Sequence, residues 1–344
     1  MKTPLHAFVP AWGNRWVWLP VLALAAAVPL VVESEYVLNV GVLCGIYIIL
    51  VSSLNVTNGY TGLFSFGHAA FYGIGAYTAA ILATRYGWPF WLTFPVAGAV
   101  AAAAGAAIAL PTLRLKGIFL ALVTIGFQEI AFLVTMNWVS LTRGPMGIPR
   151  IPPPALPGVE FRSNAEFYYL VLLVDVAVIF VLARLVRSRV GRTFVAIRED
   201  ELAAQSCGIA VFPAKVLAFT IATFFAGVAG AFFAHHARFV SADSFRLDET
   251  FLILTMLIVG GMGSLAGPVI GAVALVILPE VFRFLAEYRG VVYGLILIGV
   301  ILFRPQGIAG VPGIIQPRGA PRPLADAAPD APDASPAEPA KEPS

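Results

Sequence analysis

Apolar runs recur along most of this sequence, and several are long enough to cross a lipid bilayer as a helix. A helix needs about 20 apolar residues to span the hydrocarbon core. Only 12% of the residues are charged, against roughly 25% in soluble domains. A transmembrane β-barrel would instead show short segments in which apolar and polar residues alternate. The sequence therefore predicts an all-α, polytopic membrane helix bundle.

The apolar runs predict about ten crossings, with at least one pair of broken helices. The expected spans are residues 17–32, 36–56, 58–83, 90–110, 117–138, 167–186 and 214–234, two short spans within 249–282, and 290–303. The first run follows a long N-terminal region, contains Pro20 and Pro29 and is soon followed by another span, so we expect a retained span rather than a cleaved signal peptide.

Positive charge sets the expected orientation of these spans. The loop at residues 187–213 and its borders hold the densest basic cluster, which the positive-inside rule places in the cytoplasm. The cluster comprises Arg184, Arg187, Arg189, Arg192, Arg198 and Lys215. Counting crossings from this loop puts both termini in the cytoplasm and the proline-rich loop 139–166 outside the cell membrane.

The sequence divides into three parts. Residues 1–16 are expected to form a cytoplasmic N-terminus, residues 17–316 a transmembrane domain, and residues 317–344 a cytoplasmic tail. The tail consists mainly of Pro, Ala, Asp and Glu, which cannot bury a core, so it is predicted to be disordered. We expect a multi-pass protein of the cell (inner) membrane, surrounded by the lipid bilayer.

The middle of the loop 187–213 is predicted to be a single short helix over residues 192–207. This segment lacks Pro and Gly and is rich in Ala, Glu and Leu. Gly208 follows at the position where a left-handed residue ends many helices. The apolar residues lie on two arcs, Phe194, Ile197 and Ala204, and Val195 and Leu202. Such a helix suits docking into a groove on a second protein, and an ordinary solvated loop that fixes orientation is the alternative.

Residues 58–83 form an unusual span, because five glycines lie among Ser65, His68 and several aromatic residues. Discontinuous helices in transporters expose backbone groups to a water-filled path. Tight helix packing is the alternative explanation for the glycines, and a satisfied packing residue is the alternative for His68. Ser65 and His68 are therefore candidate residues of a translocation path.

The span at residues 117–138 carries Gln128 and Glu129 near its middle. A carboxylate at the bilayer centre costs about 2.5–3.5 kcal/mol on insertion scales, so it should face the bundle interior or water. Gln128 and Glu129 join the candidates for a path. A protonated or hydrogen-bonded structural carboxyl is the alternative, and the same two interpretations apply to Asp175 in a later span.

Residues 249–282 are too long for one simple span and are interrupted by glycines. Gly263, Gly267 and Gly271 are four residues apart and would share one helix face. We expect two short spans with a break near residues 260–264. The glycines assigned to the break or to close helix packing are Gly260, Gly261, Gly263, Gly267 and Gly271.

Several chemistries have no support in the sequence. No phosphate-binding GxxxxGK[ST] motif occurs, and no set of residues suggests catalysis, so we do not expect an enzyme. Cys44 and Cys207 lie in a span and in a cytoplasmic loop, which argues against a disulfide or a metal site. The net charge is only +3, which gives no indication of nucleic-acid binding. Three classes of membrane protein remain possible: a channel, an ion-coupled transporter, and the pore of a transporter powered by another chain.

Four segments resemble one family, the LivM-type permeases of branched-chain amino acid ABC importers. They are GYTGLFSFGHAAFYGIGAYTAAIL (59–82), VGRTFVAIREDELAAQSCGI (190–209), GGMGSLAGPVIGA (260–272) and FRPQGI (303–308). The resemblance covers roughly residues 35 to 310. The combination GHAAF resembles the M-type subunit rather than its H-type partner. The implied fold is the helix bundle of an ABC importer permease.

In this family, the cytoplasmic loop resembles a coupling motif that reads EAA, three residues, then Gly. Ala203, Ala204 and Gly208 fit that spacing, whereas the acidic residue, Glu201, lies one place early and Leu202 takes its position. The resemblance implies that this loop contacts an ATPase, with apolar side chains in a groove and charges at its rim. The residues implied are Val195, Ile197, Arg198, Glu201, Leu202, Ala203, Ala204 and Gly208.

The resemblance also implies partners. They are an H-type permease that completes a heterodimer, two cytoplasmic ATPase subunits that bind ATP and Mg²⁺, and an extracytoplasmic substrate-binding protein. No cofactor is expected in this chain. The implied cargo is leucine, isoleucine or valine, although related systems carry urea, short amides or other amino acids. The competing hypotheses are a self-contained ion-coupled transporter that uses Glu129, Asp175 or His68, and a structural membrane subunit without a path.

Overall fold

The apolar runs form helices in the computed structural model, which describes residues 15–31, 34–115, 117–156, 159–160, 163–281, 289–304 and 306–309. All of these residues belong to one compact unit, Met1–Ile314. Five helices are long and apolar enough to cross a membrane by length and composition. They are Glu35–Tyr60, Phe90–Thr112, Ile118–Asn137, Asn164–Arg187 and Val211–Ala237. The chain is therefore an all-α, polytopic membrane helix bundle.

The first half of the chain contains five long helices, followed by short helices and strands. Its elements are α1 (Arg15–Val31), α2 (Glu35–Leu54), the π-helix η3 (Asn55–Tyr60), α3 (His68–Arg85), α4 (Phe90–Thr112), α5 (Ile118–Asn137), α6 (Val139–Thr142), the 3₁₀-helix η4 (Gly144–Met146), β1 (Ile148–Pro149), β2 (Ala155–Leu156) and β3 (Val159–Glu160).

The second half continues with longer and broken helices. Its elements are α7 (Asn164–Arg187), α8 (Arg189–Glu199), α9 (Glu201–Ser206), α10 (Val211–Ala237), β4 (Phe239–Val240), the 3₁₀-helix η5 (Ala242–Phe245), α11 (Leu247–Gly260), α12 (Ala266–Val281) and α13 (Arg289–Phe303). The strands form two antiparallel pairs, β1 with β4 and β2 with β3.

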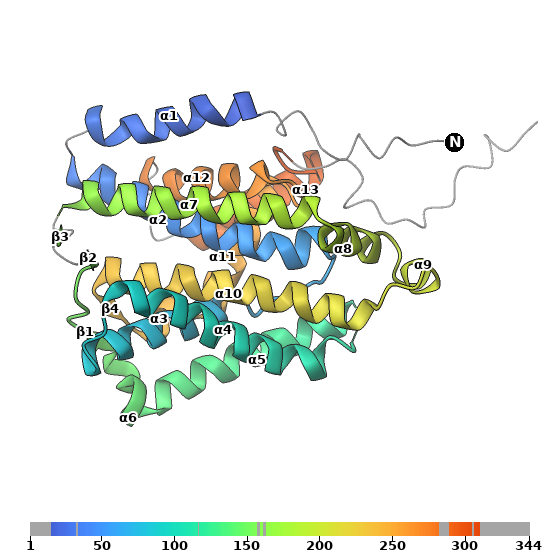
Figure 1. Ribbon diagram of the computed structural model, residues 1–344, viewed down its shortest axis with the longest axis horizontal. Coiled ribbons are helices and arrows are strands. Elements are labelled where there is room, and N and C mark those ends of the chain that lie inside the picture. The colour runs from blue at the N-terminus through green and yellow to red at the C-terminus, as the bar shows by residue number, and fades with distance from the viewer. Residues whose placement is uncertain are drawn as a thin grey trace, which may run out of the picture. The chain divides into compact units, whose positions relative to one another are not determined.

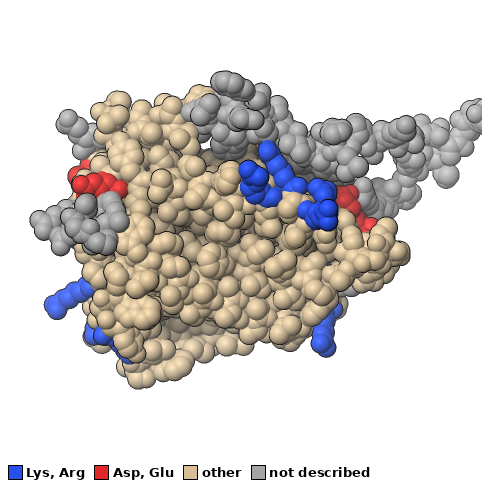
Figure 2. Space-filling view, viewed as in Figure 1, with Lys and Arg blue, Asp and Glu red and all other residues tan. Residues whose placement is uncertain are grey.

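The long helices run side by side between two ends of the bundle (Figure 1). Helices α8 and α9 lie at one end, and the short strands lie at the other. On the face seen in Figure 2, the charged side chains gather toward these two ends and leave the surface between them uncharged. This distribution fits a bundle that crosses a bilayer, because charged groups are costly in the hydrocarbon core.

Helices α2 and α10 form the centre of the bundle. Helix α10 packs against α4, α3 and α2, while α2 also packs against α7 and α12. In the most apolar 18-residue stretch of each helix, 61% of the residues are buried in α10 but only 22% in α5. Helices α3 and α10 touch at Gly75, where a Cβ would overlap the backbone of Gly227. Small residues let membrane helices approach this closely.

Two predicted elements are wrong. Residues 58–83 were expected to form one span, but the first helix continues as η3 to Tyr60, an irregular segment follows, and α3 begins only at His68. Gly62 has φ +72°, a left-handed conformation that ends helical structure and suits glycine. The single helix expected over 192–207 is divided into α8 and α9.

Asp200 divides that helix because its side chain competes for the backbone. It has an extended conformation, with φ −160° and ψ 114°, and its Oδ1 accepts hydrogen bonds from the N–H groups of Leu202 (2.9 Å) and Ala203 (3.0 Å). Asp is among the best helix N-cap residues, so it starts α9 rather than continuing α8.

Some predictions lie outside the described residues. These are residues 1–14 of the N-terminus, the tail 317–344, and four positions of the loop 139–166. The side of the membrane on which each end of the bundle lies, and the total of ten crossings, stay predictions.

Candidate functional site

The first candidate site is the break between α2–η3 and α3. After Tyr60 the chain has no regular secondary structure through residues 62–67, and most of these residues are covered by the bundle, where backbone groups need partners. Asn58 supplies two of them, because its Nδ2 donates to the carbonyl of Ser65 (3.2 Å) and its Oδ1 accepts from the Ser65 N–H (3.3 Å). One side-chain amide thus holds the irregular segment 62–67 against η3.

Side chains from two other helices satisfy the buried beginning of α3. The first N–H groups of a helix have no partner within it and must find one elsewhere. The bonds are Phe66 N–H to Thr124 Oγ1 (3.0 Å), Ala69 N–H to Thr250 Oγ1 (3.3 Å) and Ala70 N–H to Gln128 Oε1 (2.6 Å). Helices α5 and α11 therefore fix the position at which α3 starts.

Three of the four path candidates meet at this break. Ser65, His68 and Gln128 are buried. His68 Nε2 lies 2.7 Å from Ser53 Oγ, and Gln128 Nε2 donates to the carbonyl of Phe245 (2.6 Å). These contacts give His68 and Gln128 structural roles in holding the break.

The other intramembrane acids lie elsewhere. Glu129 is exposed on α5, next in sequence to the buried Gln128 but on a different helix face. Asp175 on α7 is buried and lies opposite Gly45 of α2, and its Oδ1 has no hydrogen-bond partner among the described residues. Helix packing does not gather Glu129, Asp175 and His68 into one ionisable site.

A second break lies between α11 and α12, as the glycine-rich sequence predicts. Asn55 of η3 closes this turn, because its Nδ2 donates to the Ser264 carbonyl (2.7 Å) and its Oδ1 accepts from the Gly263 N–H (2.8 Å). Gly261 and Gly263 have positive φ angles of 115° and 73°. The π-helix η3 therefore contacts both breaks through two asparagine side chains, Asn55 and Asn58.

The glycines of the second break pack helix backbones together. A Cβ on Gly260 would overlap the Gly267 carbonyl, and one on Gly271 would overlap the Met256 carbonyl. The prediction that Gly263 shares a helix face with Gly267 and Gly271 is wrong, because Gly263 lies in the turn before α12. The positive φ of Gly263 explains this, since a left-handed residue does not continue a helix.

The second candidate site is the pair of short helices α8 and α9. Ile197, Ala204 and Val211 form a small buried cluster that attaches both helices to the start of α10. Phe194 is also fully buried. Ile197 was expected to fill a groove on a second protein, but it is 4% exposed and therefore stabilises the loop from inside.

Leu202 is the apolar side chain that α9 presents to solvent. It is 68% exposed, and its neighbour Ala203 is exposed as well, while Val195 is half-buried. The chain covers little of the Leu202 side chain, so this residue is a candidate for contact with another protein.

Two ionic contacts fix α8 and α9 in place. Glu201 forms a salt bridge with Lys215 of α10 at 2.9 Å, and the Lys215 side chain is 6% exposed. Arg198 donates from Nη1 to the carbonyl of Gly59 (2.9 Å) and pairs with Glu199 (3.0 Å). Arg198 was expected at the rim of a partner's groove, but its side chain is 10% exposed and binds the chain's own π-helix.

Gly208 ends α9 with the geometry expected from the sequence. Its φ is +81°. The Gly208 N–H donates to the Gln205 carbonyl (2.9 Å) and the Ile209 N–H to the Ala204 carbonyl (3.1 Å). This pair of bonds is the Schellman motif, which favours glycine at the left-handed position.

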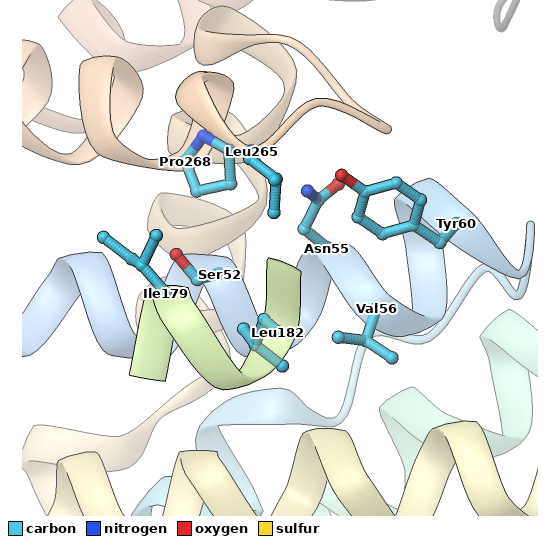
Figure 3. A pocket seen from close by; sticks show the side chains of 8 residues that line it. All are labelled: Ser52, Asn55, Val56, Tyr60, Ile179, Leu182, Leu265 and Pro268. Carbon is cyan, nitrogen blue, oxygen red and sulfur yellow. The ribbon is translucent and has the colours of Figure 1, made fainter. Parts of the chain in front are cut away.

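A small pocket lies where three elements meet (Figure 3). It is lined by Ser52, Asn55, Val56 and Tyr60 of α2–η3, Ile179 and Leu182 of α7, and Leu265 and Pro268 near the start of α12. Its volume of about 10 Å³ holds roughly one water molecule, so it is too small for an amino acid. The buried hydroxyl of Ser52 has no protein partner among the described residues.

The described part of the chain contains neither a candidate metal site nor a disulfide. No group of three or more His, Cys, Asp or Glu residues is placed to hold a metal ion there. Cys44 is buried and Cys207 is exposed, and neither forms a disulfide.

Polar residues that the sequence pattern did not single out build the two breaks. Asn55, Asn58, Thr124 and Thr250 all have structural hydrogen bonds inside the bundle. The available signal was the presence of two asparagines within four residues at the end of an apolar run, since amide side chains in a membrane need partners.

Known proteins resemble this chain over most of its described length. The family described as "Branched-chain amino acid transport system / permease component" matches residues 36–301. The high-affinity branched-chain amino acid transport system permease protein LivM of Escherichia coli (strain K12) is 41% identical over 310 residues, which are 83% of this chain and 73% of that protein.

More distant relatives share the same region. The probable branched-chain amino acid transport permease protein LivM of Methanocaldococcus jannaschii is 24% identical over 321 residues, covering 79% of this chain and 93% of that protein. The autoinducer 2 import system permease protein LsrC of Klebsiella pneumoniae is 29% identical over 210 residues, which are 55% of this chain and 59% of that protein. No solved structure matches. The chain belongs to the family of permease components of branched-chain amino acid transport systems.

Proposed function

We propose that this chain is one of the two permease halves of an ATP-driven importer for leucine, isoleucine and valine. Family membership and the names of the relatives support the role and the cargo class. LsrC, which is named for the import of a different compound, matches a shorter part of the chain. An extracytoplasmic binding protein would deliver the amino acid, and an H-type permease would complete the membrane path.

The observation that carries the proposal is the direct contact between α8 and the first helix break. Arg198 of α8 binds the Gly59 carbonyl, and Gly62 lies so close that a Cβ there would approach Arg198 Cγ to 2.8 Å. Residues 62–67 then lead into α3. A displacement of α8 would therefore be transmitted to the broken segment through a short hydrogen bond and a tight backbone contact.

Two ATPase subunits in the cytoplasm would supply that displacement. The exposed side chain of Leu202 would fill a groove on one of them, with Ala203 beside it. Glu201 and Lys215 would keep α9 fixed to α10 while the ATPases close on ATP and Mg²⁺. This chain holds neither nucleotide nor metal in that scheme, and it catalyses no reaction itself.

The path would follow the segment between the two breaks. Ser65, His68 and Gln128 surround the start of α3, where a shift of the irregular segment 62–67 would open or close a passage. In this proposal, both termini and α8–α9 lie in the cytoplasm, and the strands lie on the outer side of the cell membrane.

The self-contained ion-coupled alternative has weaker support. The comparisons do not favour it, and the groups on which it depends are separated. His68 is bonded to Ser53, Asp175 lies against α2, and Glu129 is on the outer face of α5. An ion-coupled mechanism needs ionisable groups that act together.

The proposal is tested by the substitution Leu202→Asp in the full complex. Losing a buried apolar anchor at an interface costs ~2 kcal/mol or more, roughly a 30-fold loss of affinity. We therefore expect the ATPase to be lost from the detergent-solubilised complex while membrane insertion of the permease is unchanged. Gln205→Asp is the matched control, because Gln205 is also exposed on α9 but carries no apolar anchor.

Normal co-purification of the ATPase with the Leu202→Asp variant would contradict the docking proposal. Uptake into vesicles provides an independent check. ATP should drive uptake after an ionophore has removed the proton gradient, and uptake that required the gradient would instead support an ion-coupled transporter.

A further inference from the structure

The outward surface of α5 differs from that of the other long helices. We define the α5 outer face as the exposed residues Leu122, Gly126, Glu129, Ile130 and Leu133. Leu122, Gly126, Glu129 and Leu133 follow the three- and four-residue spacing of one helix face. Helix α5 lies at the edge of the bundle in Figure 1 and is the least buried of the five spans.

Glu129 is poorly suited to contact with lipid. It lies eleven residues after Ile118 and eight before Asn137, about 16 Å and 12 Å from the helix ends at 1.5 Å per residue. It has no hydrogen-bond or ion-pair partner among the described residues. Hydrocarbon offers no donor to a carboxylate, and ionisable groups in membrane helices almost always face protein or water.

The outer face of α7 shows what a lipid-facing surface looks like in this chain. Its exposed side chains at mid-helix are apolar, with Leu173 at 68% and Phe180 at 58% exposure. The ionisable residue near the middle of α7, Asp175, points inward and is 5% exposed. Glu129 is therefore an exception to the distribution of charge in the described spans.

Two further features of this region suit a helix from another protein. A Cβ on Gly126 would meet no atom within 4 Å, so a neighbouring helix can approach closely there. Beside it, a groove of about 230 Å³ runs between α3 and α5 and reaches the outer face at Ile130. Tyr77 lines this groove, and its buried hydroxyl has no partner among the described residues.

We propose that the α5 outer face is the surface on which the second permease subunit packs. A helix of that subunit would place a cation or hydrogen-bond donor opposite Glu129 and apolar side chains in the groove beside Gly126. The inference rests on the proposed function, because it requires a two-permease complex. The Glu129 carboxylate needs a cation or a hydrogen-bond donor. A protein helix can supply one at mid-bilayer depth and a lipid tail cannot, which identifies the partner as a protein.

Site-specific photocrosslinking in the full complex tests this surface. A photoreactive phenylalanine analogue replaces Leu133 in one variant and Leu173, the matched exposed leucine of α7, in another. We expect a crosslink to the second permease from position 133 and none from position 173. A second permease that co-purifies but crosslinks only from position 173 would overturn the inference and leave the proposed function intact. Absence of any co-purifying permease would overturn both.

The substitution Glu129→Leu gives a second test because the two environments predict opposite signs. If lipid covered α5, removing the carboxylate would leave assembly unchanged or strengthen it. If a partner helix places a hydrogen-bond donor opposite position 129, leucine leaves that donor unpaired. We then expect at least a tenfold loss of the co-purified second permease, with unchanged membrane insertion. Glu129→Gln keeps a hydrogen-bond acceptor and should retain most of the assembly. Equal assembly of Glu129→Leu and the unaltered chain would overturn the inference.

Discussion

At the scale of single residues, Arg198 connects the surface loop to the interior of the bundle. Its guanidinium binds the Gly59 carbonyl, one residue before the π-helix ends. A charge-assisted hydrogen bond to a backbone carbonyl in a mostly buried position is stronger than a neutral one. The loop is therefore fixed to the part of α2–η3 that precedes the first break.

Replacing Arg198 tests whether this contact transmits motion. Arg198→Met keeps an unbranched apolar stem but removes the bond to Gly59, which is worth ~1.5–3 kcal/mol. We expect the ATPase to remain bound while substrate-stimulated ATP hydrolysis falls roughly tenfold or more. Arg192→Met is the control, because Arg192 is exposed and, among the described residues, its side chain bonds only to the Arg187 carbonyl. Equal stimulation in both variants would refute the role of Arg198.

Gly208 tests the backbone geometry at the end of α9. Its φ of +81° costs about 1–2 kcal/mol for an ordinary side chain and is worst for a β-branched one. Gly208→Val should therefore weaken ATPase co-purification, whereas Gly208→Asn, which tolerates the left-handed region, should do so much less. Steric crowding cannot explain such a difference, because a Cβ at Gly208 meets no atom within 4 Å. Identical behaviour of the two variants would contradict the backbone explanation.

At the scale of helices, the two breaks depend on neighbouring elements. Helices α11 and α12 touch through glycines on both sides of the turn, and η3 closes the turn with Asn55. The segment after α13 adds backbone hydrogen bonds, from the Ile308 N–H to Val259 (2.9 Å) and from the Ala309 N–H to Gly260 (2.8 Å). This explains how a chain interrupted inside the membrane keeps its backbone satisfied.

Gly267 tests the packing of this pair of helices. A Cβ there would overlap the Gly261 carbonyl, so Gly267→Leu must separate α11 from α12. Overpacking of this kind costs ~1–3 kcal/mol or more, and we expect a lower thermal unfolding temperature in detergent together with loss of uptake. Gly294→Leu on α13 is the matched control, because a Cβ there meets nothing within 4 Å. Equal melting temperatures for the two variants would mean that the close contact is not needed.

At the scale of the whole molecule, the two ends of the bundle are chemically different. One end carries the basic loop with α8 and α9, and the other carries the two strand pairs (Figure 1). The positive-inside rule predicts that the basic end faces the cytoplasm. The order of the helices agrees with this arrangement, since α7 leads to the basic end and α10 returns from it.

Reporter fusions test this orientation. A reporter fused after Arg198 is expected to be active on the cytoplasmic side, and one fused after Pro154 on the opposite side, because α7 separates them. Alkaline phosphatase and a fluorescent protein give opposite signals in the two compartments and serve as paired readouts. Finding both fusions on the same side would refute the predicted number of crossings.

The sequence alone determined the class of fold and most helix positions. Apolar length and low charge are local properties, so the helices α4, α5, α7 and α10 begin and end close to the predicted spans. The break before α12 and the left-handed Gly208 were also predictable. Glycine adopts a positive φ more readily than other residues, and this preference is a property of the residue itself.

The tertiary structure decided which side chains lie inside and which lie outside. Ile197 and Leu202 are both apolar residues of one loop, yet one is buried against Val211 and the other is exposed. Gln128 and Glu129 are adjacent, yet one caps α3 and the other faces outward from α5. Burial and hydrogen bonding depend on elements distant in sequence, so no local pattern distinguishes the members of such pairs.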